Sequence, residues 1–283
     1  PPVSYLDRVH DCAQYQPENY LPFRISGEQV GQVRLEFLRK LASFENTFCC
    51  TDDGLNLADN LHRFEQRTEA VGRVLEGLRE EGLVPGWRDE AYPVTNSFGS
   101  PPFFDMERAA VPLFGVRGYG VHVNGFVGDG GDMRMWIGRR SMSKPTGPGK
   151  LDQMVAGGQP SGMSLRENML KESAEEANIP RSLAEEAVSV GAISYLTERP
   201  EGLRHDVLFN FDLHLPENFE PVNTDDEVDA FYLWPMDQIM EVIRETDDFK
   251  FNSALVIIDF LVRRGFICPD DPDYAAIVAG LHR

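Results

Sequence analysis

Residues 157–179 read GGQPSGMSLRENMLKESAEEANI, two glycines followed at a short distance by the pattern of an amphipathic helix. Ser164 and Glu167 form a capping box, in which the hydroxyl accepts a backbone N–H and the glutamate reaches back to the helix start. Asn178 tolerates the left-handed conformation and a proline follows two residues later, so the helix is expected to end near Ala177. The sequence therefore predicts a helix that is well defined at both ends and entered through a glycine loop.

Acidic residues are crowded on one side of this predicted helix. On 100° steps the acidic side holds Glu172, Glu175 and Glu176, and the apolar side is expected to hold Leu170, Ala174 and Ala177. Carboxylates at these spacings repel by roughly 0.2–0.5 kcal/mol per pair, and the adjacent Lys171 is not expected to be the best-placed neutraliser. The cluster is either a solvated helix face or a site for Mg²⁺, which takes oxygen ligands and shares them with a substrate phosphate.

The composition is that of a soluble protein with room for one large or two modest domains: 283 residues, 42% hydrophobic and 26% charged. No apolar run is long enough to span a membrane, and the first residues lack the basic start and apolar core of a signal peptide. The formal net charge of −19 disfavours nucleic-acid polymers and anionic membranes, which are bound chiefly through clustered Lys and Arg. A small phosphate ester stays compatible with this charge where a divalent cation or local arginines offset it.

The cysteines do not indicate a disulfide framework or a zinc site. Cys12, Cys49, Cys50 and Cys268 include one adjacent pair and no C-x-x-C spacing. We expect buried, reduced thiols, and together with the missing signal peptide this favours the cytoplasm. No feature of the sequence indicates an oligomeric partner.

The sequence pattern changes near residue 116. Residues 1–116 combine two expected helices, over 30–44 and 63–82, with loops that contain Pro and Gly, and they show no compact chemical motif. From residue 117 onward short strands dominate, beginning with a hairpin whose strands are residues 119–127 and 133–140. Further strands are expected at 188–196, 205–215 and 229–235, with a buried helix over 253–265. Mixed strands with interspersed helices predict an α/β or α+β layer fold.

The glycine loop and acidic helix together resemble the Nudix box, G-x5-E-x7-R-E-U-x-E-E-x-G-U, in which U is an apolar residue. The match is anchored on Lys171-Glu172 and Glu175-Glu176, and it places Gly157 at the first glycine. The chain departs from the pattern at four positions, Met163, Lys171, Ser173 and Asn178, in place of glutamate, arginine, an apolar residue and glycine. Because lysine is a point charge without the bidentate fork of arginine, we expect these departures to affect rate and metal affinity more than fold.

The resemblance extends over nearly the whole chain. The stretches WRDEAYPV (87–94), ERAAVPLFGVRGYGVHVNGFV (107–127) and MWIGRRSMSKPTGPGKLDQMVAGGQPSGMS (135–164) are similar to one branch of the Nudix hydrolases, related to the domain fused to thiamine pyrophosphokinase in some fungi. This resemblance implies a Nudix fold over residues 117–283, a mixed sheet sandwiched between helices. It also implies a smaller N-terminal α+β domain over residues 1–116.

The implied reaction is hydrolysis of a diphosphate linked to another moiety X, with Mg²⁺ or Mn²⁺ and attack of water on phosphorus. In this branch the implied substrates are thiamine diphosphate derivatives, particularly oxidised or damaged forms, which are cleaved to the monophosphate. A metal that neutralises anhydride oxygens and polarises water agrees with this reaction type. Carried over to this chain, Glu172 and Glu176 are metal ligands, Glu175 is a further ligand or the base, and the carbonyl of Gly157 is another candidate ligand.

Candidates for substrate contact lie on the strands. Arg139 and Arg140 end a strand and are expected to meet the phosphates, unless they form a solvated strand end. His122 and Asn124 alternate on one strand face, so they either point into a pocket or satisfy backbone groups.

Further candidates are less specific. Glu198, Asp226 and Glu227 lie near strand ends, where a supplementary acid or base is expected, although each is also a typical surface acid. The ring of X needs an aromatic platform, for which the candidates are the typical core residues Trp136, Tyr195 and Phe211.

Three functions stay open at this point. The three retained helix glutamates favour a metal-dependent diphosphohydrolase. A different substrate, such as ADP-ribose or a nucleoside triphosphate, fits the same chemistry. A binding module that senses a ligand without turnover is the third, because Met163 and Lys171 weaken the box. In each case the expected partner is a small molecule, with no nucleic-acid polymer and no membrane.

Overall fold

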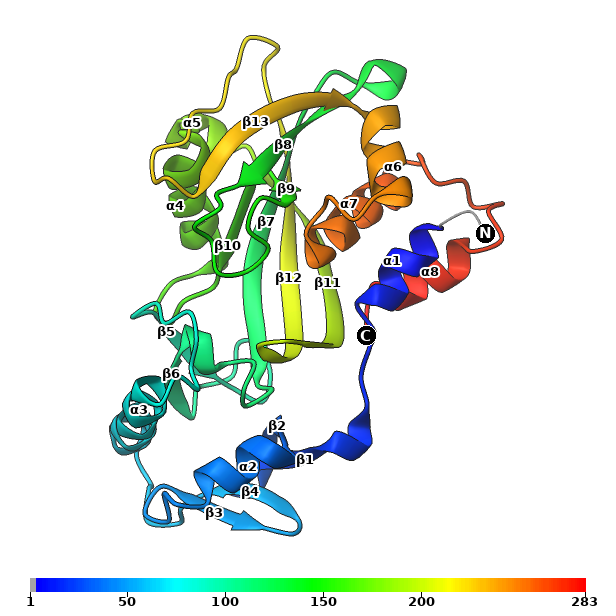
Figure 1. Ribbon diagram of the computed structural model, residues 1–283. Coiled ribbons are helices and arrows are strands. Elements are labelled where there is room, and N and C mark those ends of the chain that lie inside the picture. Colours follow the sequence, from blue (N-terminus) through cyan, green and yellow to red (C-terminus); the bar gives the residue numbers. More distant parts are fainter. Residues whose placement is uncertain (1–3) are drawn as a thin grey trace.

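The C-terminal half is built on a mixed seven-stranded sheet, seen edge-on between helices in the computed structural model, which describes residues 4–283 (Figure 1). The central strand, β7 (Arg117–Val127), pairs in parallel with β12 (Gly202–His214). On its other side β7 pairs with β8 (Arg134–Arg140) at one end and with β10 (Val155–Gly158) at the other. The remaining strands are β9 (Leu151–Gln153), β11 (Val188–Arg199) and β13 (Val228–Pro235). Because β9 pairs with β8 and β10 pairs with β7, the segment formed by β9 and β10 lies between β7 and β8 where these two strands diverge.

Helices cover both faces of this sheet (Figure 1). One face carries α4 (Leu165–Ala177) and α5 (Arg181–Ala184), packed on the apolar side chains of β7 and β10. The opposite face carries α6 (Met236–Glu245) and α7 (Phe251–Arg263), while α8 (Tyr274–Gly280) packs against the N-terminal helix and belongs to the same hydrophobic core. The expected sandwich of a mixed sheet between helices is confirmed, as are the predicted strands and the helix over 253–265 to within a few residues. None of the helices in residues 4–283 has the length and apolar character needed to cross a membrane.

The N-terminal half has its own core. Four strands form a sheet of order β2-β1-β4-β3, and their bounds are β1 (Tyr20–Ile25), β2 (Glu28–Arg34), β3 (Phe48–Thr51) and β4 (Gly54–Leu57). Two helices and a small hairpin complete it, namely α2 (Leu35–Leu41), α3 (Phe64–Glu80), β5 (Ala91–Val94) and β6 (Phe104–Glu107). Short 3₁₀ turns occur at Pro17–Asn19, Arg108–Ala110 and Gly130–Asp132. This half is the expected smaller α+β unit.

The first helix does not belong to that core. α1 (Tyr5–Asp11) packs on α6, α7 and α8, and its Tyr5 and Val9 lie in the core of the C-terminal half. The division into residues 1–116 and 117–283 stays a prediction, and its first three residues lie outside the described part of the chain. Nevertheless, the helix α1, which precedes β1 in the sequence, packs against the C-terminal half.

The predicted helix over 30–44 is wrong in its first part. Residues 28–34 form β2, which pairs with β1 through a tight turn at Ser26 and Gly27, where φ is 51° and 84°. Two successive positive φ angles match the right-handed twist of a hairpin, so the strand partner overrides the helical spacing of the apolar residues. The helix begins only at Leu35.

Two other expectations need correction. Cys12 is buried, but Cys49 and Cys268 are exposed, so the cysteines are free thiols without being uniformly buried. On α4, Ala174 is exposed although it is expected on the apolar side, and Glu176 is buried although it is expected on the acidic side. The helix packs through Met169, Ser173 and Ala177, and this rotation carries Glu176 against the sheet.

Candidate functional site

The acidic helix meets the sheet at a glycine. A Cβ built on Gly157 would lie 2.5 Å from both Cγ and Cδ of Glu172, far inside the contact limit. Only glycine therefore allows α4 to place this carboxylate against β10. The helix start is fixed by the predicted capping box of Ser164 and Glu167, and it ends in left-handed Asn178 with φ of 52°.

Glu176 lies one turn further along and also contacts β10. Its Oε2 accepts the backbone N–H of Ala156 at 2.8 Å, and the residue is only 5% exposed. Burial raises the pKa of Glu176 well above its ordinary value, although the Ala156 hydrogen bond opposes this, and the negative charge of Glu172 raises it further. A carboxyl group with a raised pKa is suited to accept a proton near neutral pH.

Lys171 is better placed than its sequence position suggested. Its Nζ lies 3.1 Å from Oε1 of Glu172 and 2.9 Å from Oε2 of Glu175, so one ammonium group joins both carboxylates. Burial lowers the pKa of Lys171, but the hydrogen bond to Glu175 and the charge of Glu172 together hold it above its ordinary value. The expectation that Lys171 is not the best-placed neutraliser is wrong, because its side chain reaches both Glu172 and Glu175, four residues further along the helix.

The donor set fits a divalent cation. Carboxylate and carbonyl oxygens are the ligands that Mg²⁺ prefers, and the Lys171 ammonium already marks a cation position between Glu172 and Glu175. Within residues 4–283 no three acidic, His or Cys side chains converge on one point, because Glu175 turns to Lys171 and Glu176 to Ala156. Metal binding would therefore exchange the ammonium for the ion. By the box pattern, the groups that could hold the ion are Glu172, Glu175, Glu176 and the carbonyl of Gly157.

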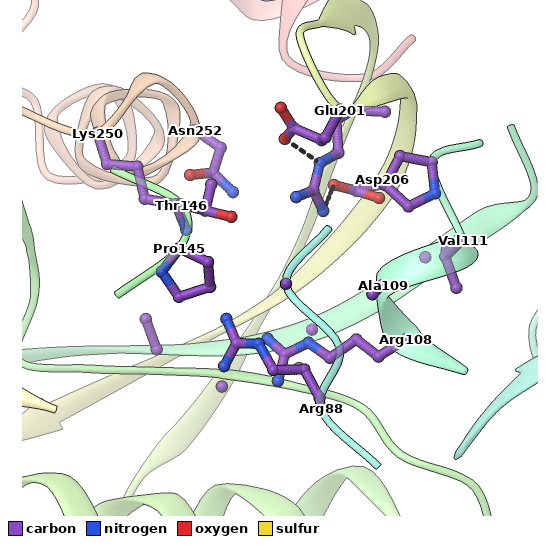
Figure 2. A pocket seen from close by; sticks show the side chains of 18 of the residues that line it. Arg88, Arg108, Ala109, Val111, Pro145, Thr146, Glu201, Asp206, Lys250 and Asn252 are labelled. Carbon is purple, nitrogen blue, oxygen red and sulfur yellow. Dashed lines mark hydrogen bonds and ion pairs between the residues drawn. The ribbon is translucent and has the colours of Figure 1, made fainter. Parts of the chain in front are cut away.

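A cavity of about 200 Å³ adjoins β10 from the other side and is lined by Ala156, Gly157 and Gly158. Its charged lining residues are mostly basic, namely Arg88, Arg108, Arg140, Lys144, Arg204 and Lys250, against Glu201 and Asp206. Figure 2 shows Arg88 and Arg108 on one wall, with Lys250, Asn252 and Thr146 across from them. In a chain with 46 acidic and 27 basic residues this local excess of cations favours an anionic ligand.

The N-terminal half supplies one wall of this cavity. Tyr92 of β5 and Arg108, just after β6, pack on Gly158, where a Cβ would lie 1.4 Å from Oη of Tyr92 and 3.1 Å from Cζ of Arg108. The guanidinium of Arg108 also lies 5.4 Å from the Tyr92 ring and 2.8 Å from Oε2 of Glu90. The two adjacent glycines thus serve opposite sides of β10, Gly157 for the helix and Gly158 for the N-terminal half.

Comparison with known proteins identifies the family of this chain. A domain of unknown function, DUF4743, matches residues 4–118. Nudix hydrolase 20, chloroplastic, of Arabidopsis thaliana is 44% identical over 285 residues, which cover 96% of this chain and 76% of the plant protein. The chain belongs to the Nudix hydrolase family. Nudix hydrolase 24, chloroplastic, of the same plant is also 44% identical, over 276 residues that cover 96% and 76% of the two chains.

The solved structures that resemble this Nudix hydrolase are distant. A MutT/nudix family protein from Enterococcus faecalis is 12% identical, covers 57% of this chain and 67% of its own, and gives a TM-score of 0.42. The family assignment therefore rests on the plant sequences, which make the chain a Nudix hydrolase. The narrower resemblance to the thiamine pyrophosphokinase branch stays a prediction.

The two arginines of the Nudix hydrolase that are predicted to contact phosphate lie in different places. Arg140 is buried in the cavity wall, where its Nη1 lies 2.8 Å from Oδ2 of Asp152 and its other nitrogens donate to the carbonyls of Thr146 and Gly147. Arg139 is exposed, lies 6.0 Å from the Tyr232 ring and does not line the cavity. Its predicted phosphate contact does not fit this placement, because alternate strand residues point to opposite faces.

His122 and Asn124 also differ in their placement. His122 lines the cavity, and its Nδ1 shares a hydrogen bond of 2.6 Å with Oε1 of Gln153. Burial lowers the pKa of His122 to about 4, so the ring is neutral at pH 7. Asn124 lies outside the cavity and donates to Asp212 at 3.1 Å, which makes it part of the core rather than of the site.

Most of the remaining candidates of the Nudix hydrolase lie elsewhere. Glu198 accepts the backbone N–H of Gln16 at 3.0 Å and lies 3.5 Å from Arg34, so it joins the two halves away from the cavity. Asp226 is exposed in a turn, whereas Glu227 forms an ion pair with the cavity residue Lys144. Tyr195 and Phe211 are buried in the cores and Trp136 packs against one, because the sheet faces that carry them are covered by helices.

Sequence reasoning missed the cavity residues of the N-terminal half, Arg88, Tyr92 and Arg108. All three lie in stretches that carry the family resemblance, WRDEAYPV and the start of ERAAVPLFGVRGYG, but no spacing rule links them to the box. Lys250 was also missed. It is half-buried, 4.0 Å from the buried Asp152, and desolvation lowers its pKa to about 7, an effect that Asp152 opposes.

Proposed function

We propose that this Nudix hydrolase cleaves the phosphoanhydride of a small diphosphate compound to the monophosphate, with Mg²⁺ or Mn²⁺. The observation that carries the proposal is the double use of β10, which touches the α4 carboxylates on one side and a cationic cavity on the other. A diphosphate requires both. Its oxygens need cationic partners, and a divalent ion that neutralises the anhydride needs carboxylate ligands.

Each group on β10 has a proposed role. When bound, the metal ion would neutralise the anhydride oxygens and polarise a water molecule. Glu172 and Glu175 are proposed ligands, since both carboxylates contact the ammonium group of Lys171. The carbonyl of Gly157 is proposed as a further ligand, because Gly157 contacts Glu172. Glu176 is proposed to ligate the ion or to accept a proton from water, which its raised pKa favours.

The cavity charge bears on the identity of X. Thiamine diphosphate carries a fixed positive charge on its thiazolium ring, whereas an oxidised ring that bears a carbonyl oxygen is neutral. A wall of arginine and lysine side chains disfavours a cationic ring and accepts a carbonyl as hydrogen-bond partner. This charge pattern supports the sequence-based proposal that oxidised thiamine diphosphate derivatives are the substrates.

A nucleoside diphosphate linked to X, such as ADP-ribose, is the second candidate. A larger cavity of about 510 Å³ lies beside the first and is lined by Phe98, Tyr119 and Met163. The rings of Phe98 and Tyr119 are 5.0 Å apart, and those of Phe98 and Phe209 are 4.6 Å apart. Such an aromatic cluster is typical of a platform on which a flat base stacks.

A substrate panel tests these proposals. The protein is incubated with Mg²⁺ and with thiamine diphosphate, oxidised thiamine diphosphate, ADP-ribose and nucleoside triphosphates, and released monophosphate and phosphate are measured. We expect turnover of the oxidised thiamine compound with the highest kcat/KM, and a lower value for intact thiamine diphosphate. Metal-dependent ligand binding without turnover of any compound would instead establish a sensing module and rule out the hydrolase.

Localisation is proposed from the sequence alone. We propose a cytoplasmic enzyme on the composition and cysteine usage, while both plant relatives carry the word chloroplastic in their names. A fluorescent fusion of the full-length natural protein tests the compartment directly.

A further inference from the structure

Arg88 is held in the cavity wall without a counter-charge. Its only hydrogen bond among residues 4–283 is donated by its backbone N–H to Oε1 of Glu107, at 2.8 Å. The side chain is half-buried, and its guanidinium faces the cavity beside that of Arg108 (Figure 2). Burial, and then the charge of Arg108, lower the pKa of Arg88. A lone arginine that is desolvated next to another arginine is stabilised by an anion between them.

The nearby carboxylates do not fill this role, because each has another cation as its direct partner. Glu90 is paired with Arg108 at 2.8 Å, and Glu227 is paired with Lys144. Both attract Arg88 only from a greater distance. Within the described residues, therefore, Arg88 is the cavity cation whose charge is left for a ligand.

A second group on the same wall is also unsatisfied. Tyr92 is only 6% exposed, and its hydroxyl has no hydrogen-bond partner among the described residues. The hydroxyl lies directly over Gly158, in the strand that also contacts the acidic helix. Buried hydroxyl groups are nearly always paired, so an unpaired one on a cavity wall indicates a missing acceptor.

We propose that Arg88, Arg108 and Tyr92 form a clamp from the N-terminal half that holds the phosphate groups of the substrate over Gly158. The clamp rests on the proposed function, which supplies the diphosphate as ligand. Guanidinium groups bind phosphate oxygens through two parallel hydrogen bonds, and the tyrosine hydroxyl donates a third contact. The N-terminal half is then a part of the binding site, and the C-terminal half alone has an incomplete one.

Inorganic pyrophosphate is the probe that tests the clamp without turnover. Its binding to the full chain is measured by titration calorimetry in metal-free buffer with chelator, for the wild type, Arg88→Met and Arg88→Lys. The matched control is Arg73→Met, which removes the same charge from the same half at an exposed position on α3, where Arg73 pairs with Glu69. Circular dichroism and melting temperature verify that each variant is folded.

We expect Arg88→Met to weaken pyrophosphate binding about tenfold or more, because it removes charge-assisted hydrogen bonds to the anion. Arg73→Met should bind as the wild type does, and Arg88→Lys should recover part of the affinity. The clamp is overturned when the folded Arg88→Met variant binds as tightly as Arg73→Met, or when the wild type binds no pyrophosphate.

The turnover assay separates the clamp from the proposed function. With Mg²⁺ and a turned-over substrate, Arg88→Met should raise KM more than it lowers kcat. Turnover by the wild type with an unchanged KM in Arg88→Met would contradict the clamp and leave the hydrolase intact. No turnover of any compound, together with pyrophosphate binding that depends on Arg88, would contradict the hydrolase and support the clamp.

Discussion

Glu172 packs directly against Gly157: a Cβ on the glycine would lie 2.5 Å from the Cγ and Cδ atoms of the glutamate. The contact joins the strand β10 to the helix α4 at the residue that the box pattern marks as its first glycine. The φ of Gly157 is not in the left-handed region, so the requirement for glycine is one of space rather than of backbone conformation. The glycine is therefore the reason that the acidic helix face reaches the sheet.

Gly157→Ala is expected to displace Glu172 while leaving the fold intact. Because the added methyl group meets a side chain rather than backbone, the protein accommodates it by moving the carboxylate. Moving a proposed metal ligand by about 1 Å costs roughly 10²-fold in rate. The measurement is Mg²⁺-dependent turnover beside melting temperature. Gly131→Ala, where nothing lies within 4 Å, is the control and should keep full activity.

Glu176→Gln is expected to lower kcat by about 10²–10⁴-fold without unfolding the chain. The amide oxygen still accepts the Ala156 N–H, and a buried negative charge is removed. Since burial raises the folded-state pKa of Glu176, its stabilising contribution is present at low pH and lost as pH rises through that pKa. Urea unfolding at pH 8 should thus show a variant at least as stable as the wild type. Glu186→Gln, at an exposed position, should change neither quantity.

Lys171→Met is expected to increase the stabilisation that Mg²⁺ gives. In the wild type the ion competes with an ammonium group that already joins Glu172 and Glu175. Without the lysine the two carboxylates repel each other until a cation binds, so the metal-free variant should melt lower and gain more on addition of Mg²⁺. Melting curves across a Mg²⁺ titration measure this. An equal gain in both proteins would show that the ammonium and the ion do not share a position.

Arg140→Met and Arg139→Met should differ sharply in stability. Arg140 is the close partner of the buried Asp152, and removing it leaves that carboxylate with Lys250 at 4.0 Å, for a loss of about 3 kcal/mol. Arg139 is exposed, and its removal should cost less than about 0.5 kcal/mol. Urea unfolding of the two variants measures both values. Similar losses would contradict the different placement of the two side chains.

His122 should make stability fall between pH 7 and pH 5. Its folded-state pKa is lowered to about 4 by burial, whereas the ordinary value is 6.5, so at pH 5 the unfolded chain binds a proton that the folded chain does not. The free energy of unfolding should fall by about 2 kcal/mol from this group. In His122→Asn that contribution disappears, while all other titrating groups remain. Parallel pH dependence in the two proteins, measured by urea unfolding, would show that the folded-state pKa is not lowered.

Local signals in the sequence were sufficient for the elements themselves. The capping box at Ser164 and the left-handed Asn178 bound α4 as expected, because both are interactions within a few residues of the helix ends. The strands around residues 119–140 follow from alternation and turn residues in the same way. The strand at 28–34 was missed, since its partner and its turn residues decided the outcome over the spacing of apolar residues.

The sequence by itself determined the Nudix family pattern, the acidic helix and the glycine loop that delivers it, because these depend on residue type and short spacing. Only the tertiary structure decided which side chains share the cavity. Rotation of α4 buried Glu176, the sheet pleat turned Arg139 away from Arg140, and the N-terminal half brought Arg88 and Tyr92 onto Gly158. These placements depend on packing between segments that are distant in the chain, about which the local pattern of residues carries no information.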